Sequence, residues 1–574
     1  MGPAGPVILA LLACGVCRLG GWRGPDWAAQ VYRGGQASHW VLAIWGPGWY
    51  GGTYPLNYSL VYPPVAGYVG LWLVAALSAA GATFCFDRLA SRHFGRRPAG
   101  SWYFALSTVI EVAIGQLPTL AGEALALGSV LCLVRYQDAR GGAGPRGRAG
   151  GGPRGGAGGW ARGFLPAGFA MGALAGLTSP VVGAFLSMAL VAWALSDVGR
   201  APARQLVTEL LAGAFTFVST AALPLIFPGP GYFPFGFGDL VVTVAICGLL
   251  AWPLVVSSRA VRVGAVLYAA VSVGVFLLRT PVGDNVTRLA AYVGVPLAIC
   301  YLPEAAHRLA LGPGGPLRRC AATVVPAAMV ASMVAWHWSP ALGALDAAAN
   351  GPSSNAAYYA PLIAELASLS RNGPVRVEIP PTVHHWESAY VAPKFVLARG
   401  WERQLDIAYD PLFYQAGPLT PSEYRTWLLA NGVSFVALAG APLDYAATAE
   451  ARLLRSGEVK GLRAVWHSAS WQLWRVVGSQ GLASRPATVV SMTPRSVDVR
   501  YSRPGQSTLR VRWSPYWSLA GPGAQEACLR PAAGGWTELA SAVAGQLQLT
   551  MSVLGPNHGS CPARGGVRSG LNGP

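Results

Sequence analysis

The sequence predicts an α-helical polytopic membrane protein, with about eleven transmembrane helices followed by an α/β region and a β-sandwich. Only 11% of its residues are charged and 53% are hydrophobic, whereas soluble domains carry about 25% charged residues. Apolar runs of spanning length alternate with arginine-rich and arginine-poor connections. From Pro340 onward the apolar runs shorten and charged residues become frequent. These observations exclude an ordinary soluble fold for the first part of the chain.

Eleven apolar segments are expected to form the spans. They cover residues 5–20, 64–86, 101–117, 118–134, 163–178, 180–196, 206–227, 239–257, 263–278, 288–303 and 320–337. The first is interpreted as a retained span rather than a signal peptide, because no basic residue precedes it and no clear cleavage site follows it. Residues 1–338 are therefore predicted to form one transmembrane domain.

The distribution of arginine predicts the orientation in the plasma membrane. With the amino terminus in the cytoplasm, the cytoplasmic connections contain 17 arginines and the opposite connections contain five. Cytoplasmic loops of membrane proteins carry such an excess of basic residues. An odd number of spans then leaves everything after about Trp338 outside the cell. Because many of the arginines lie in short loops, the net charge of +18 does not indicate a nucleic-acid partner.

The exported region is predicted to contain two domains. Residues 345–478 alternate helical and strand-like segments, which is typical of an α/β domain. Residues 483–574 contain short β-rich segments separated by proline, glycine and serine, which is typical of a sandwich. Cys528 and Cys561 are the only cysteines in this region, so we expect them to form a disulfide in the oxidising environment outside the cell.

The first external loop, residues 21–63, is the longest of the predicted connections on the external side before the exported region, and such long loops are usually functional. It contains five Trp and five Tyr, and Asp26 is its only acidic residue. One interpretation is an aromatic belt at the membrane surface. The other is a sugar-binding platform beside a carboxylate that accepts a proton from a hydroxyl group. On the second interpretation the candidate substrate-binding residues are Trp27, Tyr32, Trp49, Tyr50, Tyr54 and Tyr58.

A first span, a long external loop that opens with PDWAAQVYRGG, further spans and an exported carboxyl-terminal region resemble the C-type integral-membrane glycosyltransferases. The segments WYGGTYPLNYSLVYPPVAGYVG, PVGDNVTRL and VRWSPYW resemble uncharacterised polytopic proteins of actinobacteria. The resemblance implies a polyprenyl-phosphate-linked sugar as donor and an acidic residue of the first external loop as the base or its assistant. Asp26 matches that position.

Loss of a sugar-phosphate leaving group also requires positive charge. Arg279, Asn285 and Arg288, on the fifth predicted external loop, are candidates for binding the phosphate, because arginine makes bidentate contacts with phosphate oxygens. The alternative is that both arginines simply end spans at the membrane surface. No metal-binding pattern is predicted: His384, His385 and Glu387 form a compact HHxE cluster without a partner motif, and a requirement for a divalent metal stays open.

The sequence therefore favours a glycosyltransferase that moves a sugar from a polyprenyl-phosphate donor to an envelope glycan or lipid acceptor, with Asp26 as its catalytic residue. Two alternatives remain. A transporter or flippase would use a polar path through the membrane, to which Glu123, inside a predicted span, would contribute. A non-catalytic scaffold for envelope assembly would explain why the chain lacks the second adjacent acid of the common family pattern. The sequence contains no P-loop and no GxSxG motif, so there is no case for an ATPase or a serine hydrolase.

Overall fold

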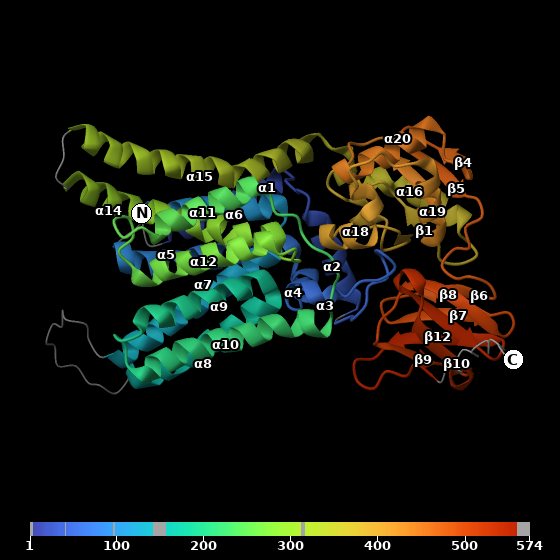
Figure 1. Cartoon of the computed structure of the whole chain (residues 1–574), viewed down its shortest axis with the longest axis horizontal. Coiled ribbons are helices and arrows are strands. Elements are labelled where there is room, and N and C mark those ends of the chain that lie inside the picture. The colour runs from blue at the N-terminus through green and yellow to red at the C-terminus, as the bar shows by residue number, and fades with distance from the viewer. Residues whose placement is uncertain (1–3, 41, 96–97, 142–156, 312–315, 560–574) are drawn as a thin grey trace, which may run out of the picture.

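The computed structural model describes residues 4–40, 42–95, 98–141, 157–311 and 316–559. Long helices form a bundle from the first part of the chain, and the carboxyl-terminal sheets lie together at one end of this bundle (Figure 1). Six described segments are long and apolar enough to cross a membrane, and shorter apolar helices accompany them. The chain is therefore a multi-pass membrane protein, and the predicted fold class is confirmed.

Each predicted span overlaps a helix of the bundle. These helices are α1 (Gly5–Leu19), α5 (Leu71–Phe94), α6 (Ala99–Ile114), α7 (Leu117–Gly141), α8 (Ala157–Thr178), α9 (Pro180–Asp197), α10 (Ala203–Ile226), α11 (Phe237–Ala251), α12 (Arg259–Leu277), α14 (Val295–Leu311) and α15 (Pro316–Asn350). The second span begins later than expected, because Gly70 separates α5 from the short α4 (Tyr62–Val69). Gly70 has a φ of +102°, which residues with a side chain rarely adopt.

The tenth predicted span is not a regular α-helix. The 3₁₀ turn η1 (Gly283–Val286) precedes it, the span starts within the short α13 (Thr287–Leu289), and a π-helical segment, η2 (Ala290–Gly294), then leads into α14. Single π-helical turns inside α-helices are rare and occur frequently at functional sites. Arg288 lies in α13, two positions before this segment begins.

The first carboxyl-terminal region contains a five-stranded mixed sheet in the order β2 (Val396–Leu397), β1 (Arg376–Glu378), β3 (Val433–Ala439), β5 (Trp471–Val476) and β4 (Leu462–His467). Strand β1 pairs in parallel with β2 and β3, and the remaining pairs are antiparallel. Parallel neighbours end at the same edge of a sheet, so the loops that follow β1, β2 and β3 emerge together.

The second carboxyl-terminal region has two antiparallel sheets around a shared core that includes Val497, Leu509 and Leu539. One sheet has the order β6 (Ala487–Met492), β7 (Ser496–Tyr501), β12 (Gly545–Met551) and β9 (Trp517–Ala520). The other has the order β10 (Ala527–Pro531), β11 (Trp536–Ser541) and β8 (Gly505–Arg512). Cys528 is disulfide-bonded, and its predicted partner Cys561 lies outside the described residues.

The first long loop lies between the bundle and both carboxyl-terminal regions (Figure 1). It contains α2 (Trp27–His39), α3 (Pro55–Tyr58) and α4. The backbone carbonyl of Gly48 accepts a hydrogen bond from the Leu397 amide at 2.9 Å, and that of Gly51 accepts one from the Arg512 amide at 2.8 Å. The loop thus joins the bundle to the mixed sheet and to the sandwich at once.

Candidate active site

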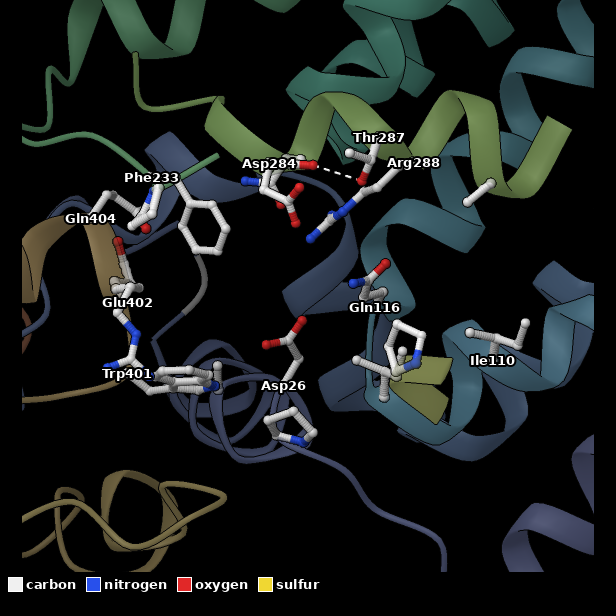
Figure 2. A pocket seen from close by; sticks show the side chains of 18 of the residues that line it. Asp26, Ile110, Gln116, Phe233, Asp284, Thr287, Arg288, Trp401, Glu402 and Gln404 are labelled. Carbon is white, nitrogen blue, oxygen red and sulfur yellow. Dashed lines mark hydrogen bonds between the residues drawn. The ribbon is translucent and has the colours of Figure 1, made fainter. Parts of the chain in front are cut away.

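A cavity of about 690 Å³ lies where the first long loop, the ends of the bundle helices and the mixed-sheet region meet. Figure 2 shows Asp26, at the start of α2, pointing into the same space as Asp284 and Arg288, which lie on the consecutive helical turns η1 and α13. Polar residues from distant parts of the chain complete the wall: Gln30, Arg33, Tyr58, Gln116, Asp239, Asn285, His337, Glu402, Arg403, Gln404, Asp444 and Tyr445.

Asp26 is held in the cavity wall by backbone contacts with the end of α6. Its amide donates to the Ile114 carbonyl at 2.9 Å. Gly115 allows this approach, because a Cβ atom there would lie 2.4 Å from the Trp27 nitrogen. Asp26 is the N-cap residue of α2, but its side chain makes no capping hydrogen bond. Its carboxylate is therefore directed into the cavity rather than used to end the helix (Figure 2).

The surroundings of Asp26 adjust its acidity. Burial raises the pKa of the Asp26 carboxyl above its ordinary value. The positive charges of Arg288 and Arg33 oppose this rise, as does a hydrogen bond with the Trp401 side chain. A carboxylate with a raised pKa accepts a proton more readily, which suits a general base.

Arg288 lies on the border between this cavity and a second one of about 580 Å³. One of its guanidinium nitrogens donates to the Thr119 hydroxyl at 2.7 Å. The residues common to both cavities are Tyr58, Asn285, Arg288, Glu402 and Gln404. They form the wall between two spaces that an extended substrate or two substrates can occupy.

The second cavity lies against the ends of the membrane helices. Pro118, Pro180 and Pro224, from α7, α9 and α10, line one side of it. Tyr54 and Arg512 line the other side.

The predicted site residues separate into two groups. Asp26, Tyr58, Asn285 and Arg288 line the first cavity, and Tyr54 lines the second. Exposed Arg279 lies outside both cavity walls, with its guanidinium 5.2 Å from the centre of the Tyr232 ring.

The other predicted aromatic residues are packing residues in the structure and line neither cavity. The indole of Trp27 donates to the Val112 carbonyl at 2.6 Å. Tyr32 stacks on Trp49 with ring centres 4.4 Å apart, and the Trp49 indole donates to the Ser388 carbonyl at 3.2 Å. The hydroxyl of Tyr50 donates to the Glu402 carbonyl at 3.3 Å. These rings join the loop to its neighbours and are omitted from the proposed site.

Sequence reasoning missed His337 of α15, which lines the first cavity and is 3% exposed. Its Nδ1 lies 2.9 Å from the Tyr103 hydroxyl, and its Nε2 is buried without a hydrogen-bond partner. An ionisable residue in a predicted span was the available signal. Among the described residues, no group of three His, Cys, Asp or Glu side chains is arranged to hold a metal ion.

Fold and site together define a multi-pass membrane protein with a polar cavity between its helical bundle and its carboxyl-terminal region. No family model and no curated protein matches the chain. Among solved structures, the arabinofuranosyltransferase AftD from Mycobacteria is similar over 83% of this chain, with 14% identity and a TM-score of 0.47. This chain spans 40% of the AftD chain.

ArnT from Cupriavidus metallidurans is also similar. Its apo structure matches over 82% of this chain and 98% of its own, with 15% identity and a TM-score of 0.41. Its structure bound to undecaprenyl phosphate matches over 83% of this chain and 98% of its own, with 16% identity and a TM-score of 0.43.

Proposed function

We propose that the chain is a membrane glycosyltransferase that moves a sugar from a polyprenyl-phosphate donor to a cell-envelope glycan or lipid acceptor. The observation that carries this proposal is the convergence of Asp26 and Arg288 on one cavity, with Arg288 also bordering a second cavity at the ends of the membrane helices. A base and a cation on either side of a substrate-sized space are what glycosyl transfer to a hydroxyl group requires.

The reaction is a displacement at the anomeric carbon of the donor sugar. The acceptor hydroxyl attacks that carbon, and Asp26 takes up the hydroxyl proton. The bond between the anomeric carbon and the phosphate oxygen breaks, and its electrons leave with the lipid phosphate. The Arg288 guanidinium stabilises the negative charge that develops on the phosphate.

The two cavities suggest separate routes for the substrates. The donor enters through the second cavity, where apolar helix ends suit a lipid and where Arg288 and Arg512 attract its phosphate. The acceptor occupies the first cavity, where the rings of Trp401 and Tyr445 lie beside polar groups. Aromatic rings with nearby hydrogen-bonding groups suit the faces and hydroxyls of a sugar.

The interior of the bundle favours this function over transport. A third cavity, of about 430 Å³, lies among α5, α7, α9, α11 and α12, and most of its lining side chains are apolar. Glu111 and Glu123 are buried near the Asp26 end of the bundle and interact electrostatically with Arg288. A transported polar group would require a polar path farther along the bundle.

The proposal includes the orientation and division predicted from the sequence. The amino terminus is cytoplasmic, and the cavity containing Asp26 faces the outside of the plasma membrane. Residues 1–338 form the transmembrane domain, residues 345–478 an external α/β domain and residues 483–574 an external β-rich domain.

The test is transfer of radiolabelled sugar from a panel of polyprenyl-phosphate donors, in membranes that contain the full chain or a variant. We expect Asp26→Asn to reduce transfer by about 10² to 10⁴-fold, as loss of a general base does. Asp138→Asn is the matched control, because Asp138 is an exposed residue paired with Arg92 near the far end of α7. The proposal is overturned if the Asp26→Asn variant transfers sugar as well as the unmodified chain does. It is also overturned if no donor gives a product.

A further inference from the structure

His385 lies outside the cavity wall but is attached to it. It follows β1, while Trp401 follows β2 and Asp444 follows β3. Because these three strands are parallel, their following loops meet at one edge of the sheet. The rings of His385 and Trp401 stack there, with centres 3.6 Å apart and planes inclined by 13°.

The position of His385 is strongly constrained. Its side chain is almost fully buried, and its φ of +54° is a left-handed conformation that few residues other than glycine adopt. Nδ1 lies 3.6 Å from a Glu387 carboxylate oxygen, and Nε2 lies 3.5 Å from an Asp444 carboxylate oxygen. Neither ring nitrogen has a hydrogen-bond partner. Backbone strain at a buried residue that makes so few polar bonds points to a role beyond packing.

The groups around this histidine are themselves fixed. Arg403 makes two hydrogen bonds to Asp444, at 3.0 and 2.8 Å, and its guanidinium lies 5.1 Å from the centre of the Trp401 ring. Burial lowers the pKa of His385, in spite of the neighbouring Asp444. At neutral pH the imidazole is therefore uncharged and presents a flat face to the indole.

Trp401 connects this cluster to the cavity. Its ring lines the cavity beside Asp26 (Figure 2), and the Trp401 side chain lowers the pKa of the Asp26 carboxyl. Arg288, Arg33, Tyr58 and Tyr292 are the other titratable or charged groups that interact electrostatically with Asp26. The position of the indole therefore affects the proton affinity of the carboxylate, and the stack on His385 fixes that position.

We infer that His385 is a positioning residue for Asp26: by stacking on Trp401, it holds the indole in the cavity wall beside the carboxylate and helps to keep that carboxylate deprotonated, as a general base must be. The catalytic meaning of this arrangement rests on the proposed function. The stack itself is a property of the folded chain and can be tested without a substrate.

The experiment measures the proton affinity of Asp26 by carbodiimide labelling, which modifies protonated carboxyl groups, followed by peptide mass spectrometry of the full-length protein in detergent. His385→Asn removes the ring, and asparagine tolerates the left-handed backbone. Trp401→Phe keeps a ring but removes the N–H group. We expect either change to move the labelling midpoint of Asp26 to higher pH by on the order of one unit.

The double variant distinguishes positioning from general damage. If both residues act on Asp26 through the position of the same indole, His385→Asn adds no further shift to Trp401→Phe. His384→Asn is the matched control, because it alters the neighbouring buried histidine outside the stack and is expected to leave the midpoint unchanged. An unchanged midpoint in Trp401→Phe overturns the inference even if His385→Asn does not fold, and additive shifts overturn it as well.

Transfer assays separate this inference from the proposed function. We expect His385→Asn to lower kcat, to leave KM unchanged and to move the acid limb of the pH profile to higher pH. If Asp26→Asn retains full transfer, the proposed function fails. The labelling experiment still tests whether the His385–Trp401 stack affects the proton affinity of Asp26. If Asp26→Asn abolishes transfer and His385→Asn shifts neither midpoint nor acid limb, only the positioning role fails.

Discussion

Two groups of aromatic residues in the first long loop differ in what surrounds them. Trp27, Trp49 and Tyr50 are each 1% exposed and pack against the bundle and the mixed-sheet region. Tyr54 and Tyr58 are only partly buried and border the two cavities. Aromatic content alone therefore does not distinguish a packing residue from a ligand-binding residue. The distinction depends on partners that lie 85 to 352 positions away in the chain.

The largest effect on stability is expected from Trp49→Ala. This change removes the stack on Tyr32 and the hydrogen bond to Ser388. Truncation of a buried tryptophan costs about 3–5 kcal/mol, so the unfolding temperature in detergent should fall sharply. The KM for the donor should stay unchanged in protein that remains folded. A raised KM at an unchanged unfolding temperature would instead make Trp49 a ligand-binding residue.

A similar loss of stability is expected when the ion pair between Arg33 and Glu402 is broken. The Arg33 guanidinium lies 2.6 Å from a Glu402 carboxylate oxygen, and the two side chains are 4% and 15% exposed. Arg33→Met leaves a partly buried carboxylate without its partner, which costs about 3 kcal/mol. Arg33→Met combined with Glu402→Leu should recover most of the unfolding temperature. No recovery in the double variant would show that the pair is not the origin of the loss.

A smaller, pH-dependent effect is expected at Glu387, which begins the short helix α17 (Glu387–Tyr390) against which α2 packs. Burial raises the pKa of Glu387 to about 7. The folded state therefore holds a proton that the unfolded state has lost, and stability falls as the pH rises from about 4 to 7. Glu387→Gln should remove this fall and be more stable than the unmodified chain by about 2 kcal/mol above pH 7. If the unfolding temperatures of Glu387→Gln and of the unmodified chain change with pH in the same way, this expectation is contradicted.

The smallest effect on stability is expected at Tyr58, which lines both cavities. Tyr58→Leu removes a ring that lies 3.8 Å from the Arg33 guanidinium and lines both cavities. We expect KM to rise about tenfold, equivalent to about 1.4 kcal/mol of binding, with a small change in unfolding temperature. Steady-state transfer assays at several donor and acceptor concentrations measure this. An unchanged KM for both substrates would assign Tyr58 to packing as well.

Much of the fold followed from simple physical patterns in the sequence. Hydropathy located the spans, because a membrane helix must be apolar over its length, and strand periodicity indicated both carboxyl-terminal regions. The break at Gly70 was missed, because an apolar run continues through it and only the backbone conformation separates α4 from α5.

The candidate site was less accessible to sequence reasoning. Asp26 was identifiable as the only acidic residue of the first long loop, and Arg288 as a cation on the fifth predicted external loop, although their catalytic roles remain predictions. The contacts of Trp401 and His337 with the same cavity depend on tertiary packing. Residues 26 and 401 are brought together only when the first loop docks on the sheet edge, and no local pattern encodes that docking.

The π-helical segment η2 has a consequence for how the bundle tolerates change. Each residue of an α-helix rotates the chain by about 100°, so one extra residue in a single turn changes the direction of everything on one side relative to the other. Through η2, α14 packs on α6 and α15 while Arg288 faces the cavities. Deleting Ala290 or Ala291 would restore regular winding and turn Arg288 away from the cavities, although no charged or aromatic side chain had been altered.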